Sequence, residues 1–396
     1  MKQLVNSILI LVLAGVILVG CSKDKAIPDG YQRIIGNDEG QIANKILLAE
    51  NESGAREIKR VDTSQSTDLL LGTYEQYNCG IFLQFSNLPD TLNIVSADLK
   101  FHVQDRLAPG DSSYWDTPHQ ATVNIYLSDT TGVGPENPPI ADNTYLLASE
   151  TIYSDSLNDI IFSLDTMRVN QWLKTDSSGT EHGIWLTTEN ADYMAVFYAF
   201  ESLEATYMPR MTLIYNYTDS TGTKLDTLTY YTARDQFIFP DPPENLTLDD
   251  NFLYIGRGVA FRSYLKFDFS EFDTTQHINR AILELTSNAA HSIRNTDGVN
   301  NSLIYRMTSA WGEGDVWETP QSASYSPTVA DSILSFDITP SVQAWISGQY
   351  ENFGFQLQSF NEGATLGRIA FYSVNSDSVF QPKVYLYYTS PASQEF

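Results

Sequence analysis

Short segments of alternating apolar and polar residues run through most of the chain, and they are rich in Val, Ile, Thr, Tyr and Phe. Clear examples are Thr122–Leu127, Met211–Tyr217 and Lys383–Tyr388, and such segments are separated by Gly, Pro, Asn and Asp. Alternation with a period of two is typical of half-buried β-strands. Helical periodicity is confined to short stretches at Met167–Lys174 and Ser341–Ile346. The pattern therefore predicts an all-β chain.

The two helical stretches lie at matching places in an internal repeat. The matched segments are, in order, Leu71-Gly72 with Ile255-Gly256, Phe82–Phe85 with Tyr264–Phe267, Ile94–Phe101 with Ile278–Leu285, Val169–Leu173 with Val342–Ile346, Gly183–Leu186 with Gly354–Leu357, Phe200–Ser202 with Phe371–Ser373 and Pro209–Leu213 with Pro382–Leu386. Because the order is collinear, the chain carries two copies of one domain. Each copy exceeds the roughly 100 residues of an immunoglobulin-like sandwich, which predicts two tandem jelly-roll-like β-sandwiches. Trp172 and Trp345 are expected to cap the two cores.

The repeat sets the predicted domain boundaries. The first sandwich is placed at 61–217, a linker at 218–229, the second sandwich at 230–390 and a tail at 391–396. Residues 21–60 are assigned to a tether, within which Gln41–Leu48 is compatible with an additional strand.

Residues 1–20 have the pattern of a bacterial lipoprotein signal peptide. Lys2 is the only charge, Leu4–Gly20 is almost wholly apolar, and the small residue Gly20 immediately precedes Cys21. An uncleaved membrane anchor is the alternative, but this apolar stretch is short for a span and no basic cluster follows it. The residue after Cys21 is Ser22 rather than Asp, as in lipoproteins that are sorted to the outer membrane. We therefore expect lipidation at Cys21 and a location at the bacterial outer membrane or cell surface.

Composition limits the partners of the chain. It has 23 Lys and Arg against 49 Asp and Glu, a formal net charge of −26. A surface this acidic repels phosphate backbones, so no nucleic-acid partner is expected, and membrane attachment depends on the lipid. The only cysteines are Cys21 and Cys79, and with Cys21 lipidated we expect Cys79 to be a buried apolar filler.

A further set of motifs runs through residues 230–390. These are Arg262–Asp268, Ile278–Leu285, Ile304-Tyr305, Trp311–Trp317, Phe336–Thr339, Val342–Trp345, Asn352–Phe355, Phe371–Ser373 and Gln381–Val384. In this order they resemble the DNRLRE-type domain, a jelly-roll-like family of bacterial and archaeal surface proteins related to a carbohydrate-binding module family. The resemblance implies carbohydrate binding or surface scaffolding and supplies no reaction. The first copy follows the scheme more loosely and has no counterpart of the Trp311–Trp317 segment.

The sequence lacks the spacing patterns of common catalytic and metal sites. Its five histidines show neither H-x-H nor H-E-x-x-H, and no G-x-S-x-G elbow, Walker loop or G-x-G-x-x-G fingerprint is present. We therefore expect a non-catalytic protein. A polysaccharide hydrolase or lyase is the alternative, since paired carboxylates cannot be recognised from spacing among so many acids.

Candidate ligand-binding residues come from loops that combine aromatic rings with polar planar groups, as sugar binding requires. They are Trp311, Glu313, Asp315, Trp317 and Tyr325 in the second copy, and Tyr114, Trp115 and Asp116 in the first. The alternative, that these rings fold inward and close the ends of the sandwiches, stays open. The candidate ligands for calcium are Asp241, Asp249, Asp250 and Asn251, for which a solvated acidic loop is the alternative.

These observations predict a non-catalytic, lipid-anchored envelope protein that binds a polysaccharide or other glycan through loop aromatics, with structural calcium as its candidate cofactor. The alternative is a structural or adhesion protein that assembles with other envelope proteins. An enzyme acting on polysaccharide ranks third.

Overall fold

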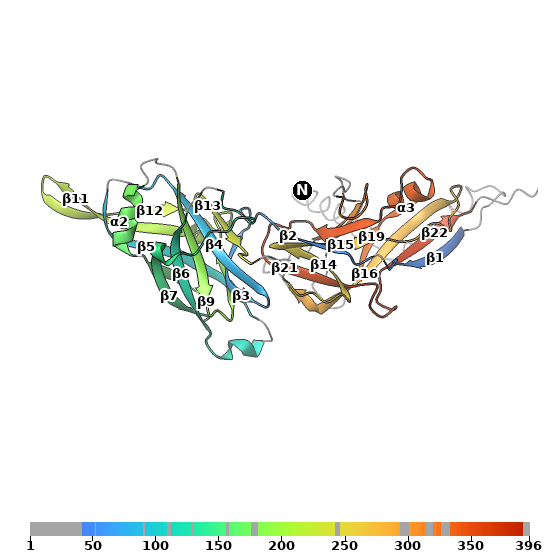
Figure 1. Cartoon of the computed structure of the whole chain (residues 1–396), viewed down its shortest axis with the longest axis horizontal. Helices are drawn as coiled ribbons and strands as arrows, with labels where there is room; N and C mark the ends of the chain where they lie inside the picture. The colour runs from blue at the N-terminus through green and yellow to red at the C-terminus, as the bar shows by residue number, and fades with distance from the viewer. Residues whose placement is uncertain are drawn as a thin grey trace, which may run out of the picture.

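The computed structural model describes residues 42–390 apart from gaps at 52, 90–91, 109–111, 129, 131, 156–157, 176–180, 242–245, 294–300, 314–319, 321 and 326–332. The described residues form mostly strands, arranged as two β-sandwiches that follow one another along the long axis of the molecule (Figure 1). The predicted fold class, all-β with tandem jelly-roll-like sandwiches, is confirmed.

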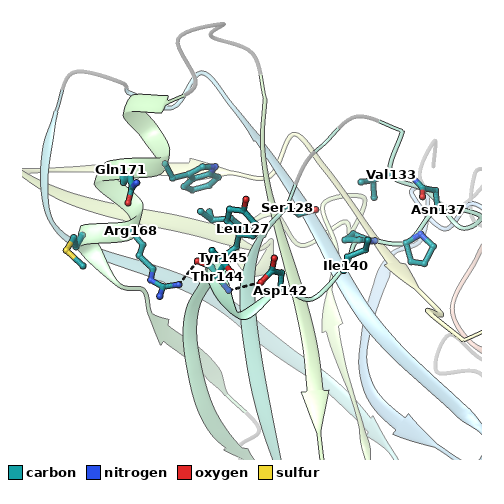
Figure 2. Close-up of a pocket in the computed structure, with 14 residues that line it drawn as sticks. Leu127, Ser128, Val133, Asn137, Ile140, Asp142, Thr144, Tyr145, Arg168 and Gln171 are labelled. Atoms are coloured by element: carbon teal, nitrogen blue, oxygen red, sulfur yellow. Dashed lines mark hydrogen bonds between the residues drawn. The ribbon is translucent and has the colours of Figure 1, made fainter.

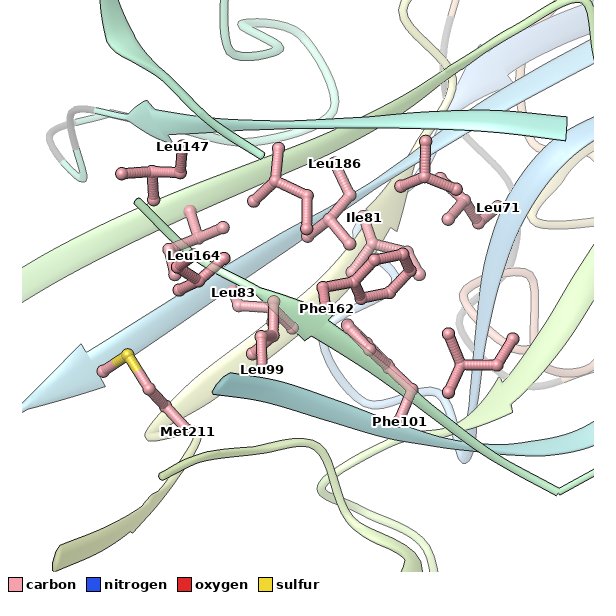
Figure 3. Packing of buried hydrophobic residues seen from close by; sticks show 14 of the residues in the cluster. Leu71, Ile81, Leu83, Leu99, Phe101, Leu147, Phe162, Leu164, Leu186 and Met211 are labelled. Atoms are coloured by element: carbon pink, nitrogen blue, oxygen red, sulfur yellow. The ribbon is translucent and has the colours of Figure 1, made fainter. Parts of the chain in front are cut away.

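The first sandwich contains the first copy of the repeat. Its elements are β3 (Asp68–Tyr74), β4 (Tyr77–Ser86), β5 (Asn93–Leu107), β6 (Gln120–Ser128), β7 (Leu146–Tyr153), β8 (Asp159–Ser163), α2 (Thr166–Thr175), β9 (Glu181–Glu189), β10 (Met194–Tyr198) and β11 (Arg210–Asp219), with short 3-10 turns at Ser112–Asp116 (η2), Asn143–Tyr145 (η3) and Ala205–Tyr207 (η4). In one layer β5 pairs with β8, β10 and β11, and in the other β4 pairs with β9, which continues to β6 and β7. Apolar side chains of the two layers meet between them, and Figure 3 shows Leu83, Leu99 and Phe101 in this core.

The second sandwich repeats these pairings. Its elements are β14 (Phe252–Arg257), β15 (Val259–Leu265), β16 (His277–Ile293), β17 (Asn301–Arg306), β18 (Ser322–Tyr325), β19 (Ile333–Asp337), α3 (Thr339–Ile346), β20 (Phe355–Ser359), β21 (Gly367–Tyr372) and β22 (Lys383–Thr389). β16 pairs with β19, β21 and β22 as β5 does with β8, β10 and β11, and β20 lies between β15 and β17 as β9 does between β4 and β6. The internal repeat in the sequence therefore corresponds to equivalent strands, paired in the same way, in the two sandwiches.

The glycines matched in the repeat occupy crowded positions. A Cβ on Gly72 would collide with the carbonyl oxygen of Tyr193, and one on Gly256 would collide with the ring of Phe261. Gly72 also has φ +117°, which glycine adopts without strain. The two helices lie where they were predicted, and Trp345 is buried between Phe269 and Phe355, with ring centroids 5.7 and 4.8 Å away.

Two pairs of strands are exchanged between the copies. β1 (Ile42–Leu48) and β2 (Arg56–Arg60) precede the first copy in the chain, yet β1 pairs with β22 and β2 with β15, both in the second sandwich. β12 (Gly222–Tyr231) and β13 (Arg234–Ile238) precede the second copy, yet they pair with β11 and β4 of the first sandwich. Because β11 corresponds to β22 and β4 to β15, each sandwich is completed by strands that precede the other copy.

This exchange changes the domain boundaries expected from the sequence. The additional strand expected at Gln41–Leu48 is present as β1, but it belongs to the second sandwich. Residues 218–229, expected to be a linker, lie in the β11–β12 hairpin instead. The reason is local: Leu225–Tyr231 alternates like a strand, and Gly222, with φ +120°, closes the turn.

A third apolar cluster, here called the junction core, joins the two sandwiches. The first sandwich contributes Leu70, Tyr77, Cys79, Met194 and Val196, the second contributes Phe252, Tyr254, Val259, Phe261, Ile293, Leu366 and Ala370, and Phe237 and Phe239 come from β13 and the residue after it. Cys79 is 1% exposed, and burial raises the pKa of its thiol well above the usual value. The expectation that Cys79 is an apolar filler is confirmed.

One buried arginine crosses the junction core. Arg368 of β21 places Nη2 3.2 Å from Oε2 of Glu75 and donates from Nη1 to the hydroxyl of Tyr77 at 3.3 Å. Its Nε donates to the carbonyl of His291 at 3.2 Å, so each nitrogen of the guanidinium has an acceptor. The charge is therefore paired inside an apolar junction, which fixes the two sandwiches relative to each other.

The strand exchange predicts where a substitution in β1 acts. Leu47 packs against the core of the second sandwich, whereas Ile46, on the other face of β1, is 56% exposed. Leu47→Ser should lower the free energy of unfolding by about 1–3 kcal/mol, and Ile46→Ser, the matched control, should change it little. Hydrogen exchange should show lost protection in β22 and β16. Loss of protection confined to strands of the first sandwich, such as β3 and β11, would contradict the exchange.

A buried carboxyl on β13 predicts a pH dependence. Asp235 is 2% exposed, its Oδ2 accepts from the amide of Phe200 at 2.8 Å and from the hydroxyl of Thr232, and burial raises its pKa to about 7. Between about pH 4 and pH 7 the folded protein holds a proton that the unfolded chain has released, so stability falls as pH rises, by about 4 kcal/mol at most. Asp235→Asn should remove this slope in urea unfolding, and Asp116→Asn, at an exposed carboxylate, should not. A slope unchanged by Asp235→Asn would contradict this assignment.

Candidate functional site

The aromatic loop predicted in the first copy is held by a histidine. The ring of Tyr114 stacks on that of His119, with centroids 3.9 Å apart and an interplanar angle of 7°. The Tyr114 hydroxyl donates to the carbonyl of Asp192 at 2.6 Å. One face of Tyr114 is therefore covered by the protein itself.

His119 is hydrogen-bonded through both ring nitrogens. Nδ1 lies 2.8 Å from Oδ2 of Asp192, and Nε2 lies 2.7 Å from the carbonyl oxygen of Tyr114. Both neighbours are acceptors, so the imidazolium, which donates from both nitrogens, fits this geometry better than the neutral ring. The hydrogen bond to Asp192, and then the one to Tyr114, raises the pKa of His119 above 6.5.

Trp115 serves packing in the structure. Its ring meets Tyr193 edge-on at 6.3 Å, and the guanidinium carbon of Arg106 lies 4.5 Å from the ring centroid. Trp115 packs against the core of the first sandwich, while Asp116 is exposed. The structure thus brings Tyr114 and Trp115 together, but neighbouring side chains already contact both rings.

The aromatic loop of the second copy is described only in part. Trp311 is half-buried and packs on the buried Tyr264, with centroids 5.4 Å apart, and Glu313 is exposed. Tyr325 lies in β18, in register with Asn301. Asp315 and Trp317 lie outside the described residues.

The residues proposed for calcium lie in an acidic turn with a cationic neighbour. Asp250 forms an ion pair with Arg56, and Oδ1 of Asp249 accepts from the amide of Asn251 at 2.9 Å. Asp241 is exposed beyond the gap at 242–245. Within the described part of the chain, no group of three or more His, Cys, Asp or Glu side chains could hold a metal ion. The described residues therefore give the calcium prediction no support.

The predicted signal peptide and Cys21 precede the described residues. Among the helices that the structure describes, none is long and apolar enough to cross a membrane.

A pocket that the sequence did not reveal lies in the first sandwich, between α2 and the segment that follows β6 (Figure 2). Its volume is about 1020 Å³. Its apolar walls include Leu127, Pro138, Pro139, Ile140, Tyr145 and Trp172. Polar groups come from Ser128, Asn137, Asp142, Thr144, Arg168 and Gln171. Of these, Ile140 is 85% exposed and Tyr145 is 51% exposed, so both side chains are accessible to a ligand.

The first turn of α2 fixes one wall of the pocket. Oδ1 of Asp165 accepts from the amides of Met167 and Arg168, which caps the start of the helix. Nη1 of Arg168 then donates to the carbonyls of Thr144 at 3.0 Å and Leu146 at 2.7 Å. Helix α2 and the turn η3 are therefore held together across the pocket floor, as the dashed line in Figure 2 shows for Thr144.

The opposite wall is held by arginines of the exchanged strands. Arg60 of β2 donates from Nη1 to the carbonyl of Pro135 at 2.8 Å and from Nη2 to that of Pro240 at 3.3 Å. Arg234 of β13 reaches the carbonyl of Val133 at 3.5 Å. The segment that carries Pro138 and Pro139 is therefore attached to the junction between the sandwiches.

The charged groups of the pocket are engaged locally. Arg168 is bound to backbone carbonyls, and Oδ1 of Asp142 accepts from the amide of Thr144 at 2.8 Å, which lowers the pKa of Asp142. One cation and one anion, each with its own partner, leave a nearly neutral pocket. The arrangement offers apolar and aromatic walls with amide and hydroxyl groups between them.

Trp172, which the sequence predicts as a cap of the first core, does pack there. Trp172 also lines a pocket with Tyr145 and Ile140, which the sequence pattern does not predict. Ile140 and Tyr145 precede β7, whereas Trp172 lies in α2, beyond β7 and β8 in the chain. The adjacent prolines at 138 and 139 are the local signal in the sequence, because they favour an extended, polyproline-like segment without internal hydrogen bonds.

Fold and pocket define this chain as a tandem jelly-roll-like protein. No family model and no curated protein matches it. Among solved structures, it is similar to the tandem CBM22-1–CBM22-2 domains of Paenibacillus barcinonensis Xyn10C, with 9% identity, 89% of this chain and 98% of that chain covered, and a TM-score of 0.13. A second similarity is to the structure of infectious bursal disease virus Gx strain, with 10% identity, coverage of 89% and 78%, and a TM-score of 0.12. At these TM-scores neither similarity carries an argument, and the DNRLRE-type resemblance stays a prediction.

The His119 contacts predict a titration measurable by NMR. Because the folded pKa is raised, the bound proton stabilises the loop fully below pH 6.5, and this stabilisation is lost as pH rises through the pKa of His119. Asp192→Asn should lower that pKa, since it removes the carboxylate. Asp159→Asn, which removes the carboxylate hydrogen-bonded to His102, is the matched control and should leave His119 unchanged. An unshifted His119 titration in Asp192→Asn would contradict the pairing.

Proposed function

We propose that this chain is a non-catalytic, lipid-anchored cell-envelope protein that binds a neutral glycan in the pocket of the first sandwich. The observation that carries the proposal is the pocket between α2 and the Pro138-Pro139 segment, with aromatic walls and planar polar groups. Pyranose rings combine apolar faces with hydroxyl groups, and such a lining matches both.

The electrostatics favour an uncharged ligand. The charges of Arg168 and Asp142 in the pocket cancel, and both side chains are hydrogen-bonded to nearby backbone groups. The pocket lining therefore offers no excess positive charge to a carboxylate or sulfate. The chain as a whole carries −26, which repels acidic polysaccharides at a distance. A neutral glycan needs no counter-charge in the pocket and is not repelled by the net negative charge of the chain. The volume of about 1020 Å³ lies at the upper end of ligand pockets, which suits an oligosaccharide rather than a monosaccharide.

The course of the chain supports presentation away from a membrane. Ile42, the first residue of β1, pairs with Thr389 at the far end of the second sandwich, and the pocket belongs to the first sandwich. A lipid on Cys21 followed by a tether up to residue 41 would therefore hold the second sandwich near the bilayer. The first sandwich and its pocket would face outward.

Glycan-array screening of the purified protein, with and without calcium, tests the proposal. Tyr145→Ala should weaken binding of the array hit about five- to thirtyfold in calorimetry, since the ring contributes stacking worth about 1–2 kcal/mol. Tyr153→Ala removes a ring of similar exposure (48%) on β7 and is the matched control.

Other outcomes would redirect the assignment. If Trp311→Ala abolishes binding while Tyr145→Ala binds as the unmodified protein does, the site lies in the second sandwich. A folded protein that binds no glycan contradicts carbohydrate binding and favours the structural or adhesion function. Glycan binding that depends on calcium would favour a calcium site in the turn that contains Asp249.

A further inference from the structure

The hairpin of β11 and β12 projects beyond the end of the first sandwich, at the left of Figure 1. Its strands pair from Arg210 and Tyr231 to Asp219 and Gly222, whereas β5 accompanies β11 only as far as Asn216. Among the described strands, none pairs with the outer edge of β12. This edge presents a row of backbone N–H and C=O groups, which can pair with another strand.

The side chains of β12 do little to prevent such pairing. Edge strands that stay unpaired usually carry proline, a bulge or several charges. β12 has no proline, pairs with β11 without a register shift, and has Lys224 and Asp226 as its only charged residues. Leu225, between them, is 64% exposed.

We propose that β12 pairs antiparallel with β12 of a second copy of this chain, about a two-fold axis at Leu225. Side chains of Lys224 and Asp226 lie on the same face of the strand because they are two residues apart. In this register each Lys224 lies opposite Asp226 of the second copy, and the two Leu225 side chains lie opposite each other on the other face. The interface is therefore self-complementary, as two-fold symmetry requires.

Charge selects this register over its neighbours. An axis at Lys224 would place two ammonium groups opposite each other, and an axis at Asp226 would place two carboxylates together. Two copies that each carry −26 also repel, so close association needs local pairs of opposite charge. The Leu225 register supplies two such pairs.

The present contacts of these side chains do not compete strongly. Nζ of Lys224 lies 2.6 Å from Oδ2 of Asp219, but the two side chains are 47% and 34% exposed, and exposed ion pairs contribute little. Asp226 accepts from the hydroxyl of Tyr215 at 3.1 Å through Oδ2, and the carboxylate has capacity for a further partner.

Sedimentation velocity of the purified protein over a wide concentration range tests the proposal. We expect a reversible monomer–dimer equilibrium that weakens with added salt. Lys224→Asp and Asp226→Lys should each raise the dissociation constant about tenfold or more, and the double variant should restore dimerisation because it swaps the pair. Circular dichroism checks that each variant is folded.

The controls distinguish this edge from others. Lys59→Asp makes the same charge change on β2, another edge strand, and should leave dimerisation unchanged. A monomer at all concentrations, or a dimer insensitive to Lys224→Asp, would overturn the proposal. Dimerisation that is lost in both single variants and not restored in the double variant would overturn the Leu225 register. None of these measurements requires glycan, so their outcome is independent of the pocket assignment.

Discussion

The exchange of strands between the two copies is the constraint on which the rest of the structure depends. A tandem repeat whose copies closed on themselves would need only a flexible connection. Here β1 and β2 complete the second sandwich and β12 and β13 complete the first, so the chain crosses between sandwiches on both sides of the first copy. The junction core and the buried Arg368 then fill the space where these crossings meet. Burial of that apolar surface opposes hinge motion that inter-domain connections usually allow.

The same strand exchange holds one wall of the pocket in place. Its Pro138-Pro139 wall is held by Arg60, which lies on a strand of the second sandwich, and by Arg234, which lies on the exchanged strand β13. Its other wall depends only on contacts within the first sandwich, through Arg168 and η3. A wall held in place in this way would lower the entropy lost on binding the proposed glycan, because the protein side would already be ordered.

Alternation and repetition were enough to predict the fold class and both helices. They also predicted which core residues occupy equivalent positions in the two copies, such as Leu99 and Leu283. The exchange was not predictable, because β1 and β12 have ordinary strand patterns that do not specify which sheet they join. The candidate site was still harder to predict from the sequence. Tyr114 and Trp115 contact each other, but Arg106 of β5 also covers Trp115, and His119 is held against Tyr114 by Asp192 from the segment between β9 and β10. The pocket unites residues distant in sequence, so no spacing could reveal it.

The two copies share a core and differ where a ligand would meet them. In the second sandwich the tryptophan of the helical turn, Trp345, is 7% exposed between Phe269 and Phe355. In the first sandwich its counterpart Trp172 is only half-buried and reaches a pocket wall. The two copies thus share one scaffold, and among the described residues they differ in how far the matched tryptophan is exposed. Arg60, on a strand of the second sandwich, holds the pocket segment of the first, so the second sandwich contributes to the shape of the pocket without lining it.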